Sequence, residues 1–485
     1  MTNDNPRVIV HLDLDAFYAA VEHVRKNIPK NEPLGVQQWN HLIAVNYAAR
    51  EFGIKRCHVD EARKLCPQIH CVHVDTIGEG KFKKAQLGPY RRASVRILEI
   101  IKRYTLKFER ASIDEVFMDL TDVVQANIIS NPNLDLTDIG TIYGEDSLDR
   151  TNIHLAYAAA IVKKIRYDIE HELGYTASAG IASTKVVAKL CSAFNKPNKQ
   201  TIVPDNQILN FMKLMPIRKI RMLGGVLGEE LSKHTTAVIC HELWEESLEN
   251  IQNWMGVAQG QMIYNLIRGV DNSEITIRHI IKSHMVAKSE KFLTQKDLEG
   301  VVLVLSFELH ERLFEDFEEN NRWPKTITIS GSWLKPTQKS KSIKFAPFSE
   351  KLTAEDLYNI TMNLLSSLKA VNGHVIPCYR LSIQLSNLEV LGKNSISNYF
   401  NFKPLPNSAG GNIPDNDSQR INERGGAINN LMPLKRRKSP KKIQKPKRNV
   451  FEMLSKSNVE TFYCPSCKQS FTLDLISIHS EHNKD

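Results

Sequence analysis

The chain has 485 residues, 42% of them apolar and 24% charged, and its formal net charge is +10. Because a single hydrophobic core rarely grows beyond ~250–300 residues, this length predicts several domains. No run approaches the ~18 uncharged apolar residues of a membrane span, and the first residues do not have the form of a signal peptide. We therefore expect an ordinary soluble protein without a membrane partner.

Strand-like and helix-like segments alternate from the N-terminus. The apolar period of residues 16–26 predicts a helix that Asn27 and Pro29 end. Its buried face is expected to hold Phe17, Ala20, Val21 and Val24. The elements predicted up to residue 103 are strands at 8–15 and 42–45 and helices at 16–26, 47–52, 60–65 and 90–103.

The alternation continues to about residue 205. Residues 109–120 have the period of a strand, whereas the polar segment 122–152 is typical of an inserted loop. A long helix over 154–173 is expected to end at Gly174. A strand at 178–181 and a helix at 185–194 capped by Ser183 follow. This pattern indicates an α/β or α+β fold.

The second half of the chain changes character twice. Residues 206–270 are helical and contain a glycine-rich turn at 223–228, which is either a phosphate-binding turn or a simple connection between helices. A small separate α+β domain is predicted over 285–390, with helices at 301–313 and 354–368 and strands at 326–333 and 379–388. Beyond residue 391 the composition is typical of disorder, and no internal repeat is present.

Acidic residues stand in two of the predicted strands. Asp13 and Asp15 lie at the end of the first strand, and the pair Asp114 and Glu115 lies within the segment 109–120. Shared carboxylate oxygens are what a two-metal phosphoryl-transfer site needs, and such ligands suit Mg²⁺. Two difficulties remain, because acidic pairs are often merely solvated and adjacent strand residues point to opposite faces. Both carboxylates reach one site only where a strand begins or bends.

Several motifs in order resemble those of the Y-family translesion DNA polymerases. The likeness covers about residues 7–390, and within the family it is greatest to the eta branch of fungal type, on residues 36–40, 52–56 and the glycine-rich turn. The matching motifs are DLDAFYAAVE at 13–22, AVNYAAR at 44–50, ASIDE at 111–115, GIASTK at 180–185 and NKPN at 195–198.

The resemblance implies a multidomain α+β fold, the right-hand polymerase with a disordered tail. Its parts would be a palm at 1–16 and 85–205, fingers at 17–84, a helical thumb at 206–280, an α+β little finger at 285–390, a disordered linker with a basic run at 391–460 and a partial zinc finger at 461–485. The chain departs from the family at Gly88, where the usual pattern has Asp, and in the short segment 76–85.

The resemblance also assigns roles to individual residues. Asp13, Asp114 and Glu115 would be the catalytic ligands of two Mg²⁺ ions, with help from the Leu14 carbonyl, and Asp15 would be a structural neighbour. Gln38 and Arg56 would contact the templating base and the incoming nucleotide. Tyr18 would be the steric gate that excludes a 2′-hydroxyl. The remaining nucleotide-binding residues would be Phe17, Tyr47, Arg50 and Lys196.

The activity implied is template-directed transfer of a dNTP to a primer 3′-hydroxyl, with accurate bypass of thymine dimers. Primer–template DNA and dNTP would then be the principal partners. Three alternatives stay open: another Y-family branch with a different lesion preference, a nucleotidyl cyclase with a similar palm, and a non-catalytic DNA-binding scaffold that recruits partners through its tail.

The tail contains two partner-binding candidates before residue 450. Residues 393–400 resemble a PCNA-binding box that ends in Tyr399 and Phe400, although Lys393 replaces the usual glutamine. The alternative is an incidental aromatic pair. A basic run from Lys435 to Arg448 supplies nine of the positive charges, so the rest of the chain is nearly neutral. It predicts nuclear localisation or a nucleic-acid-binding arm, against a simple solvated linker.

Cysteine usage indicates a reducing compartment, because the eight cysteines are scattered except for one Cys-x-x-Cys. That pair, with two later histidines, predicts a Cys2His2 zinc finger whose position resembles the finger that binds ubiquitin or ubiquitinated PCNA. The two histidines are separated by only two residues, fewer than the usual 3–5. The expected Zn²⁺ ligands are Cys464, Cys467, His479 and His482.

Overall fold

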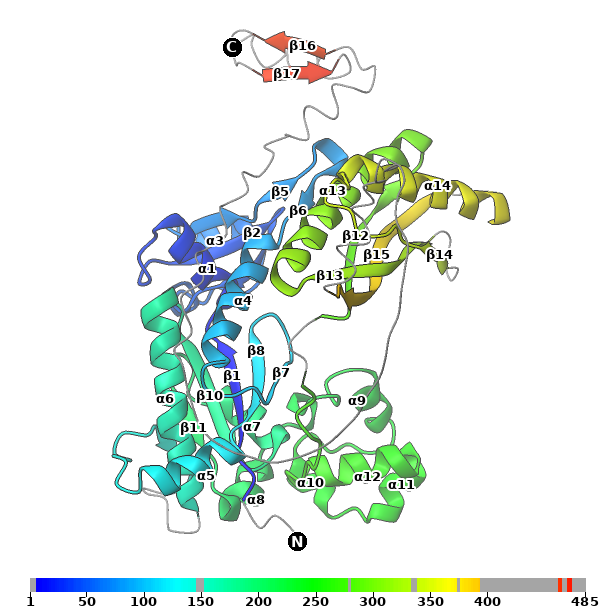
Figure 1. Cartoon of the computed structure of the whole chain (residues 1–485). Coiled ribbons are helices and arrows are strands. Elements are labelled where there is room, and N and C mark those ends of the chain that lie inside the picture. Colours follow the sequence, from blue (N-terminus) through cyan, green and yellow to red (C-terminus); the bar gives the residue numbers. More distant parts are fainter. Residues whose placement is uncertain are drawn as a thin grey trace, which may run out of the picture. The chain divides into compact units, whose positions relative to one another are not determined.

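A six-stranded mixed sheet carries the N-terminal part of the computed structural model (Figure 1). Its central strand β1 (Ile9–Leu14) is antiparallel to β8 (Glu115–Asp119) on one side and to β10 (Ala177–Ala182) on the other. β7 (Phe108–Arg110) lies outside β8, whereas β11 (Gln200–Ile202) and β9 (Thr141–Ile142) extend the sheet beyond β10 in parallel pairings.

The structure describes residues 6–144, 152–277, 281–332, 338–372, 376–392, 461–464 and 469–472. The chain divides into two units, residues 1–390 and 391–485, and each is described by itself. The described part of the second unit is one hairpin of β16 (Thr461–Cys464) and β17 (Gln469–Thr472). None of the described helices combines the length and the apolar run that a bilayer-spanning segment needs.

Alternate residues of β1 enter two different cores. Val10 and Leu12 pack in the core that contains α4 (Gly88–Ile101) and α6 (Ile153–Leu173), which is the largest of the chain's described cores. Ile9 packs on the opposite face with Phe117 and with α7 (Lys185–Ser192). Because strand side chains alternate between faces, Asp13 lies on the same face as Ile9 and α7.

The contact between β10 and α7 leaves no room for a side chain at Gly180. A Cβ there would lie 2.0 Å from the Ala188 carbonyl oxygen and 2.5 Å from Cys191 Sγ. We expect Gly180→Ala to lower the free energy of unfolding by about 2–3 kcal/mol, because overpacking a filled core forces neighbours apart. Urea denaturation measures this loss. Gly225→Ala is the control, since a Cβ at Gly225 would meet nothing within 4 Å, and equal losses in both variants would contradict the explanation.

A second, three-stranded sheet follows α1 (Phe17–Lys26). β2 (Leu34–Gln38) lies between β3 (His41–Val45) and β4 (His70–His73), antiparallel to the first and parallel to the second. Its core is closed by two short helices, α2 (Tyr47–Glu51) and α3 (Val59–Leu65). A small hairpin of β5 (Thr76–Ile77) and β6 (Lys84–Ala85) leads into α4.

A helical segment and a second α+β part complete the first unit. The helices are α8 (Ile208–Lys213), α9 (Val226–Leu231), α10 (Cys240–Trp244), α11 (Leu248–Met255) and α12 (Val257–Leu266). A four-stranded antiparallel sheet follows, in the order β12 (Ser283–Phe292), β15 (Cys378–Val390), β13 (Arg322–Ser332) and β14 (Gln338–Lys344). It packs with α13 (Gln295–Asn320) and α14 (Ala354–Asn372).

The mixed α/β character is confirmed, but the single strand predicted over 109–120 is wrong. The chain reverses there, and β7 and β8 form an antiparallel hairpin. The backbone N–H groups of Ala111 and Ser112 both donate to the Glu115 carbonyl, at 3.0 and 3.2 Å, and so close the turn. The alternating pattern is shared by both arms of a tight hairpin, which is why it suggested one continuous strand.

The polar segment 122–152 is also not a simple loop. It begins with α5 (Thr121–Ser130), where Val124 is buried in the main core, and it later supplies β9 at the sheet edge. Two residues of backbone pairing with β11 are enough for that edge strand, and no side-chain period marks them. The strands of the first unit that the sequence also did not predict are β2, β4, β5, β6, β11, β12 and β14.

Two further expectations about helix ends and faces are corrected. Thr184, not Ser183, caps α7, because its extended backbone lets the hydroxyl accept from the Val187 N–H. On α1, Val24 is 46% exposed and the polar residues Glu22 and His23 are buried instead. Glu22 forms a hydrogen bond with Tyr90, and His23 forms one with Asn46. Because both polar side chains have partners on other elements, the buried face of α1 differs from the apolar face that the sequence predicts.

Candidate active site

Three carboxylates predicted to act together lie at adjacent positions of the sheet. Asp13 on β1 is paired in register with Glu115, the first residue of β8. Asp114 precedes β8 in the turn, and its carbonyl accepts a hydrogen bond of 3.0 Å from the Leu14 N–H. Because Asp114 is a turn residue, the alternation of strand side chains does not force it away from Glu115.

Each of these carboxylates has its own polar partner in the structure. Asp13 Oδ1 lies 2.6 Å from Lys196 Nζ, and Glu115 Oε1 lies 2.7 Å from Lys189 Nζ. Ser112 Oγ donates to Asp114 Oδ1 at 2.6 Å. Among the described residues no set of three or more metal-ligating side chains is drawn together closely enough to hold an ion.

The electrostatics of this corner nonetheless fit a cation. Burial raises the pKa of Asp13, Lys196 opposes that rise, and the Glu115 and Asp114 carboxylates add to it. A partly buried group of acids that repel one another is stabilised by an added positive charge. The donor atoms are carboxylate oxygens with a backbone carbonyl nearby, which is the ligand chemistry of Mg²⁺. The residues present therefore fit the ion that the sequence implied.

Asp15 holds the backbone around this corner together. It is 3% exposed, accepts a hydrogen bond of 2.8 Å from Ser178 Oγ on β10, and accepts another of 2.8 Å from the Asn198 N–H. The second bond fixes the loop that carries Lys196. Asp15 thereby helps to position Lys196, whose ammonium group pairs with Asp13.

The predicted nucleotide-binding residues come from the helices α1 and α2 and from the loops before α3 and after α7. At the start of α2, the Arg50 guanidinium carbon lies 4.3 Å from the centre of the Tyr47 ring. Burial raises the pKa of Tyr47, and so does the Asp15 carboxylate, while Lys196 and Arg50 act against the rise. Lys196 is therefore an electrostatic neighbour of Tyr47, although it is far from Tyr47 and Arg50 in sequence.

Phe17 and Tyr18 begin α1 but differ in exposure. Phe17 is 2% exposed and packs edge-on against Tyr18 and Tyr175, so we expect it to support the site rather than present its side chain. Tyr18 is half-buried, and its ring centre lies 4.3 Å from that of Tyr90. Burial and the Asp114 carboxylate raise the pKa of the Tyr18 hydroxyl, so Tyr18 belongs to the same corner.

Gln38 and Arg56 are brought near one another by backbone contacts between the β2–β3 hairpin and the loop before α3. The Leu42 N–H donates to the Cys57 carbonyl and the Val59 N–H donates to the Asn40 carbonyl, both at 2.9 Å. Gln38 is half-buried at the hairpin end, whereas Arg56 is exposed. Sequence alone had no means to predict this crossing of two loops.

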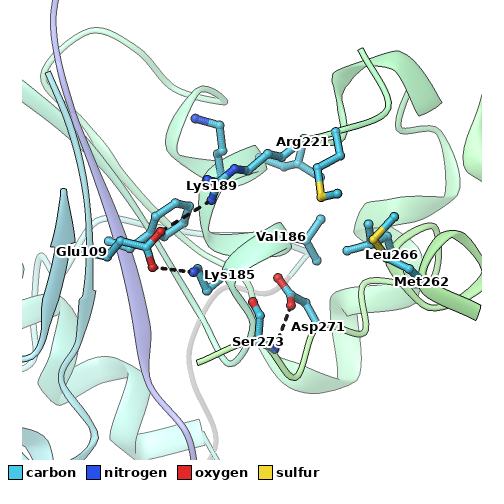
Figure 2. A pocket seen from close by; sticks show the side chains of 12 residues that line it. Glu109, Lys185, Val186, Lys189, Arg221, Met262, Leu266, Asp271 and Ser273 are labelled. Atoms are coloured by element: carbon cyan, nitrogen blue, oxygen red, sulfur yellow. Dashed lines mark hydrogen bonds and ion pairs between the residues drawn. The ribbon is translucent and has the colours of Figure 1, made fainter. Parts of the chain in front are cut away.

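A pocket of about 360 Å³ lies between the sheet, α7 and α12, and Asp13, Asp114 and Glu115 are not among the residues that line it. Figure 2 shows Lys185 and Arg221 directed at Glu109 on its wall. Lys189, which pairs with Glu115, also lines it. Sequence analysis missed the roles of Lys189 and Arg221. The only signal was a pair of lysines four residues apart on α7, a spacing that most often marks a solvated face.

The remaining predicted site residues lie largely outside the described residues. Cys464 ends β16, but Cys467, His479 and His482 lie outside, as do the box at 393–400 and the basic run at 435–448. The cysteines at 57, 66, 71, 191, 240 and 378 are free thiols.

The six-stranded sheet brings acids and cations together at one corner, and these are the groups that a phosphoryl-transfer site needs. A helical segment and a second sheet follow it. Three profiles of known protein families match the chain. The sequence profile of the impB/mucB/samB family matches residues 12–193, and that of its C-terminal domain matches residues 280–398. A profile described as DNApol eta/Rev1, HhH motif matches residues 215–270. The chain belongs to this family, the Y-family translesion polymerases, and it is eta-like.

Three relatives illustrate the likeness. The chain is 34% identical to N-acetyltransferase eso1 of Schizosaccharomyces pombe, over 99% of this chain and 62% of that protein. It is 32% identical to DNA polymerase eta of Arabidopsis thaliana, over 82% of this chain and 66% of the relative. It is 28% identical to DNA polymerase eta of Saccharomyces cerevisiae, over 79% of this chain and 77% of that protein. The chain thus spans slightly less than two thirds of the first two relatives.

Proposed function

We propose that the chain is a template-directed DNA polymerase that performs translesion synthesis, including accurate bypass of thymine dimers. The observation that carries this proposal is the corner where Asp13, Asp114 and Glu115 lie at adjacent backbone positions, with Lys196 paired to Asp13. In a Y-family chain this is where a nucleotide triphosphate and a primer end would be joined. Relatives named DNA polymerase eta, iota and IV support the polymerase activity, and bypass of thymine dimers rests on the likeness to the eta branch.

The parts of the proposed polymerase follow the sheets. The six-stranded sheet would be the palm (1–16 and 85–205), the three-stranded sheet the fingers (17–84), the helical segment the thumb (206–280), and the four-stranded sheet the little finger (285–390). The helix-hairpin-helix profile over 215–270 supports the thumb assignment. Lys189 and Arg221, which line the pocket between α7 and α12, would offer positive charge to backbone phosphates of the DNA.

Asp13, Asp114 and Glu115, with the Leu14 carbonyl, would hold two Mg²⁺ ions. When bound, the ions would activate the attacking oxygen and neutralise charge on the phosphates. Arg50 and Tyr47 would hold the triphosphate. The Lys196 ammonium group would leave Asp13 and pair with a phosphate oxygen of the nucleotide instead. The primer 3′-hydroxyl then attacks the α-phosphate and pyrophosphate leaves. The protein's own contribution is mainly orientation and preorganised charge.

Primer extension with purified protein tests the function. A template with a thymine–thymine dimer is compared with the undamaged template. Insertion of two adenines opposite the dimer, at close to the undamaged rate, is the expected result. A stall at the dimer would move the chain to another Y-family branch, and no extension on either template would reject the enzyme in favour of a scaffold.

Replacement of Arg50 tests the triphosphate site. We expect Arg50→Ala to raise KM for dNTP about tenfold or more, since a hydrogen bond to a charged group contributes ~1.5–3 kcal/mol. Arg50→Lys should recover only part of this, because lysine lacks the planar fork of guanidinium. Steady-state kinetics on an undamaged template measure KM. An unchanged KM in Arg50→Ala would remove Arg50 from the site.

The tail functions remain proposals from sequence. The segment Lys393–Phe400 would bind PCNA, and the segment with Cys464, Cys467, His479 and His482 would bind Zn²⁺ and then ubiquitin or ubiquitinated PCNA. The basic run would direct the protein to the nucleus, which agrees with relatives that are eukaryotic polymerases.

A further inference from the structure

The Tyr18 ring does not stand alone on its helix. Tyr90, which is fully buried at 0% exposure, lies behind it with ring centres 4.3 Å apart and planes tilted by 57°. Tyr90 belongs to α4, which packs against α1 (Figure 1). The position of the Tyr18 ring therefore depends on where α4 holds the Tyr90 ring.

Tyr90 is fixed at a second point on α1. Its hydroxyl donates a hydrogen bond of 2.7 Å to Glu22 Oε1, and Glu22 lies one helical turn after Tyr18. Residues four apart face the same side of a helix. Tyr90 is thus held by α1 at both ends, with its ring against Tyr18 and its hydroxyl on Glu22.

Glu22 is itself anchored although it is fully buried. Arg25 Nη1 donates to the same oxygen at 2.6 Å, and the Arg25 guanidinium also pairs with Asp75. Glu22 Oε2 has no hydrogen-bond partner within the described residues. A carboxylate in this setting cannot easily release its donors, because a buried acceptor left unpaired is costly. The Tyr90 hydroxyl is accordingly held in one place.

We propose that the hydrogen bond from Tyr90 to Glu22 is a specificity-determining contact, which positions the Tyr18 ring and so sets the discrimination between deoxyribonucleotides and ribonucleotides. This rests on the proposed function, in which Tyr18 is the steric gate. Tyr90 and Glu22 act through Tyr18 and are positioning residues. A ring that is free to tilt away from the sugar leaves room for a 2′-hydroxyl, whereas a fixed ring excludes it.

The test measures kcat/KM for a dNTP and for the matching rNTP on an undamaged template. Tyr90→Phe removes only the hydroxyl, and we expect the ratio of the two values to fall roughly three- to tenfold, the effect of one hydrogen bond. The kcat/KM for dNTP should stay within about twofold. Glu22→Gln is the matched control, since its amide oxygen still accepts from Tyr90 and the ratio should be retained. Thermal unfolding confirms that both variants are folded.

A double-mutant cycle decides whether the effect passes through Tyr18. Tyr18→Ala should itself lower the ratio strongly, and Tyr90→Phe should then add nothing. An equal effect of Tyr90→Phe in both backgrounds would overturn the proposal, as would an unchanged ratio in the single variant. If Tyr18→Ala leaves the ratio unchanged, the gate assignment and this proposal both fall, although primer extension by the parent protein would still support the polymerase.

Discussion

Asp114→Ala is expected to reduce primer extension by about a thousandfold or more while the protein stays folded. Asp114 lies in the turn before β8, where its carboxylate accepts a hydrogen bond from Ser112 and its backbone carbonyl accepts one from the Leu14 N–H. Alanine keeps that backbone bond and removes the carboxylate. Loss of a metal ligand removes several kcal/mol of transition-state stabilisation, and ~4 kcal/mol corresponds to about 10³ in rate.

The matched control is Asp119→Asn, at the far end of the same strand. The Asp119 carboxylate accepts a hydrogen bond of 2.9 Å from the Thr121 N–H at the start of α5, and it takes no part in the proposed site. Asparagine retains an oxygen for that bond, and activity should remain within about twofold. Single-turnover extension at saturating dNTP measures both variants. Activity of Asp114→Ala near that of the parent protein would remove this carboxylate from catalysis.

Breaking the buried ion pair between Glu109 and Lys185 should have the largest effect on stability. Lys185 Nζ lies 2.8 Å from Glu109 Oε2, and both side chains are only 8% exposed. We expect Glu109→Ala to lower the free energy of unfolding by about 3–5 kcal/mol, because it leaves a buried ammonium group without its partner. Urea denaturation at neutral pH measures the loss.

The double variant Glu109→Met with Lys185→Met separates the cost of an unpaired charge from the loss of contacts. Two apolar side chains of similar size should restore most of the stability. Recovery is expected to be incomplete, since Glu109 also accepts from the Thr276 N–H at 3.0 Å and Lys185 also donates to the Glu274 carbonyl. A double variant as unstable as Glu109→Ala would show that the charges are not the cause.

The pH dependence of stability follows from the same pair. Burial acts to raise the pKa of Glu109, but the hydrogen bonds from Lys185 and Thr276 outweigh it and the pKa is lowered in the folded protein. A carboxyl group whose pKa is lower when folded stabilises the protein above its unfolded pKa and loses that contribution as pH falls. The stability difference between the parent protein and Glu109→Gln should therefore shrink below about pH 4.3.

Much of the site was predictable because it depends on short segments of chain. The helix that ends at Gly174, the strand that carries Asp13 and the acidic pair at 114–115 have local signals in their apolar periods and end residues. The β7–β8 turn had only a weak signal in the sequence. Ser112 and Asp114 stabilise it through local hydrogen bonds. Sequence reasoning took it for a strand because both arms share one period.

By itself the sequence determined the mixed α/β character, the main helices and the family, because these depend on local periodicity and on motifs in order. Only the tertiary structure decided which distant groups meet: Lys196 with Asp13, Lys189 with Glu115, and Tyr90 with Tyr18 and Glu22. Those contacts depend on strand register and on the packing of α4 and α7. Neither strand register nor helix packing produces a periodic pattern in the sequence. A lysine that pairs with a distant carboxylate has the same local sequence as one that faces water.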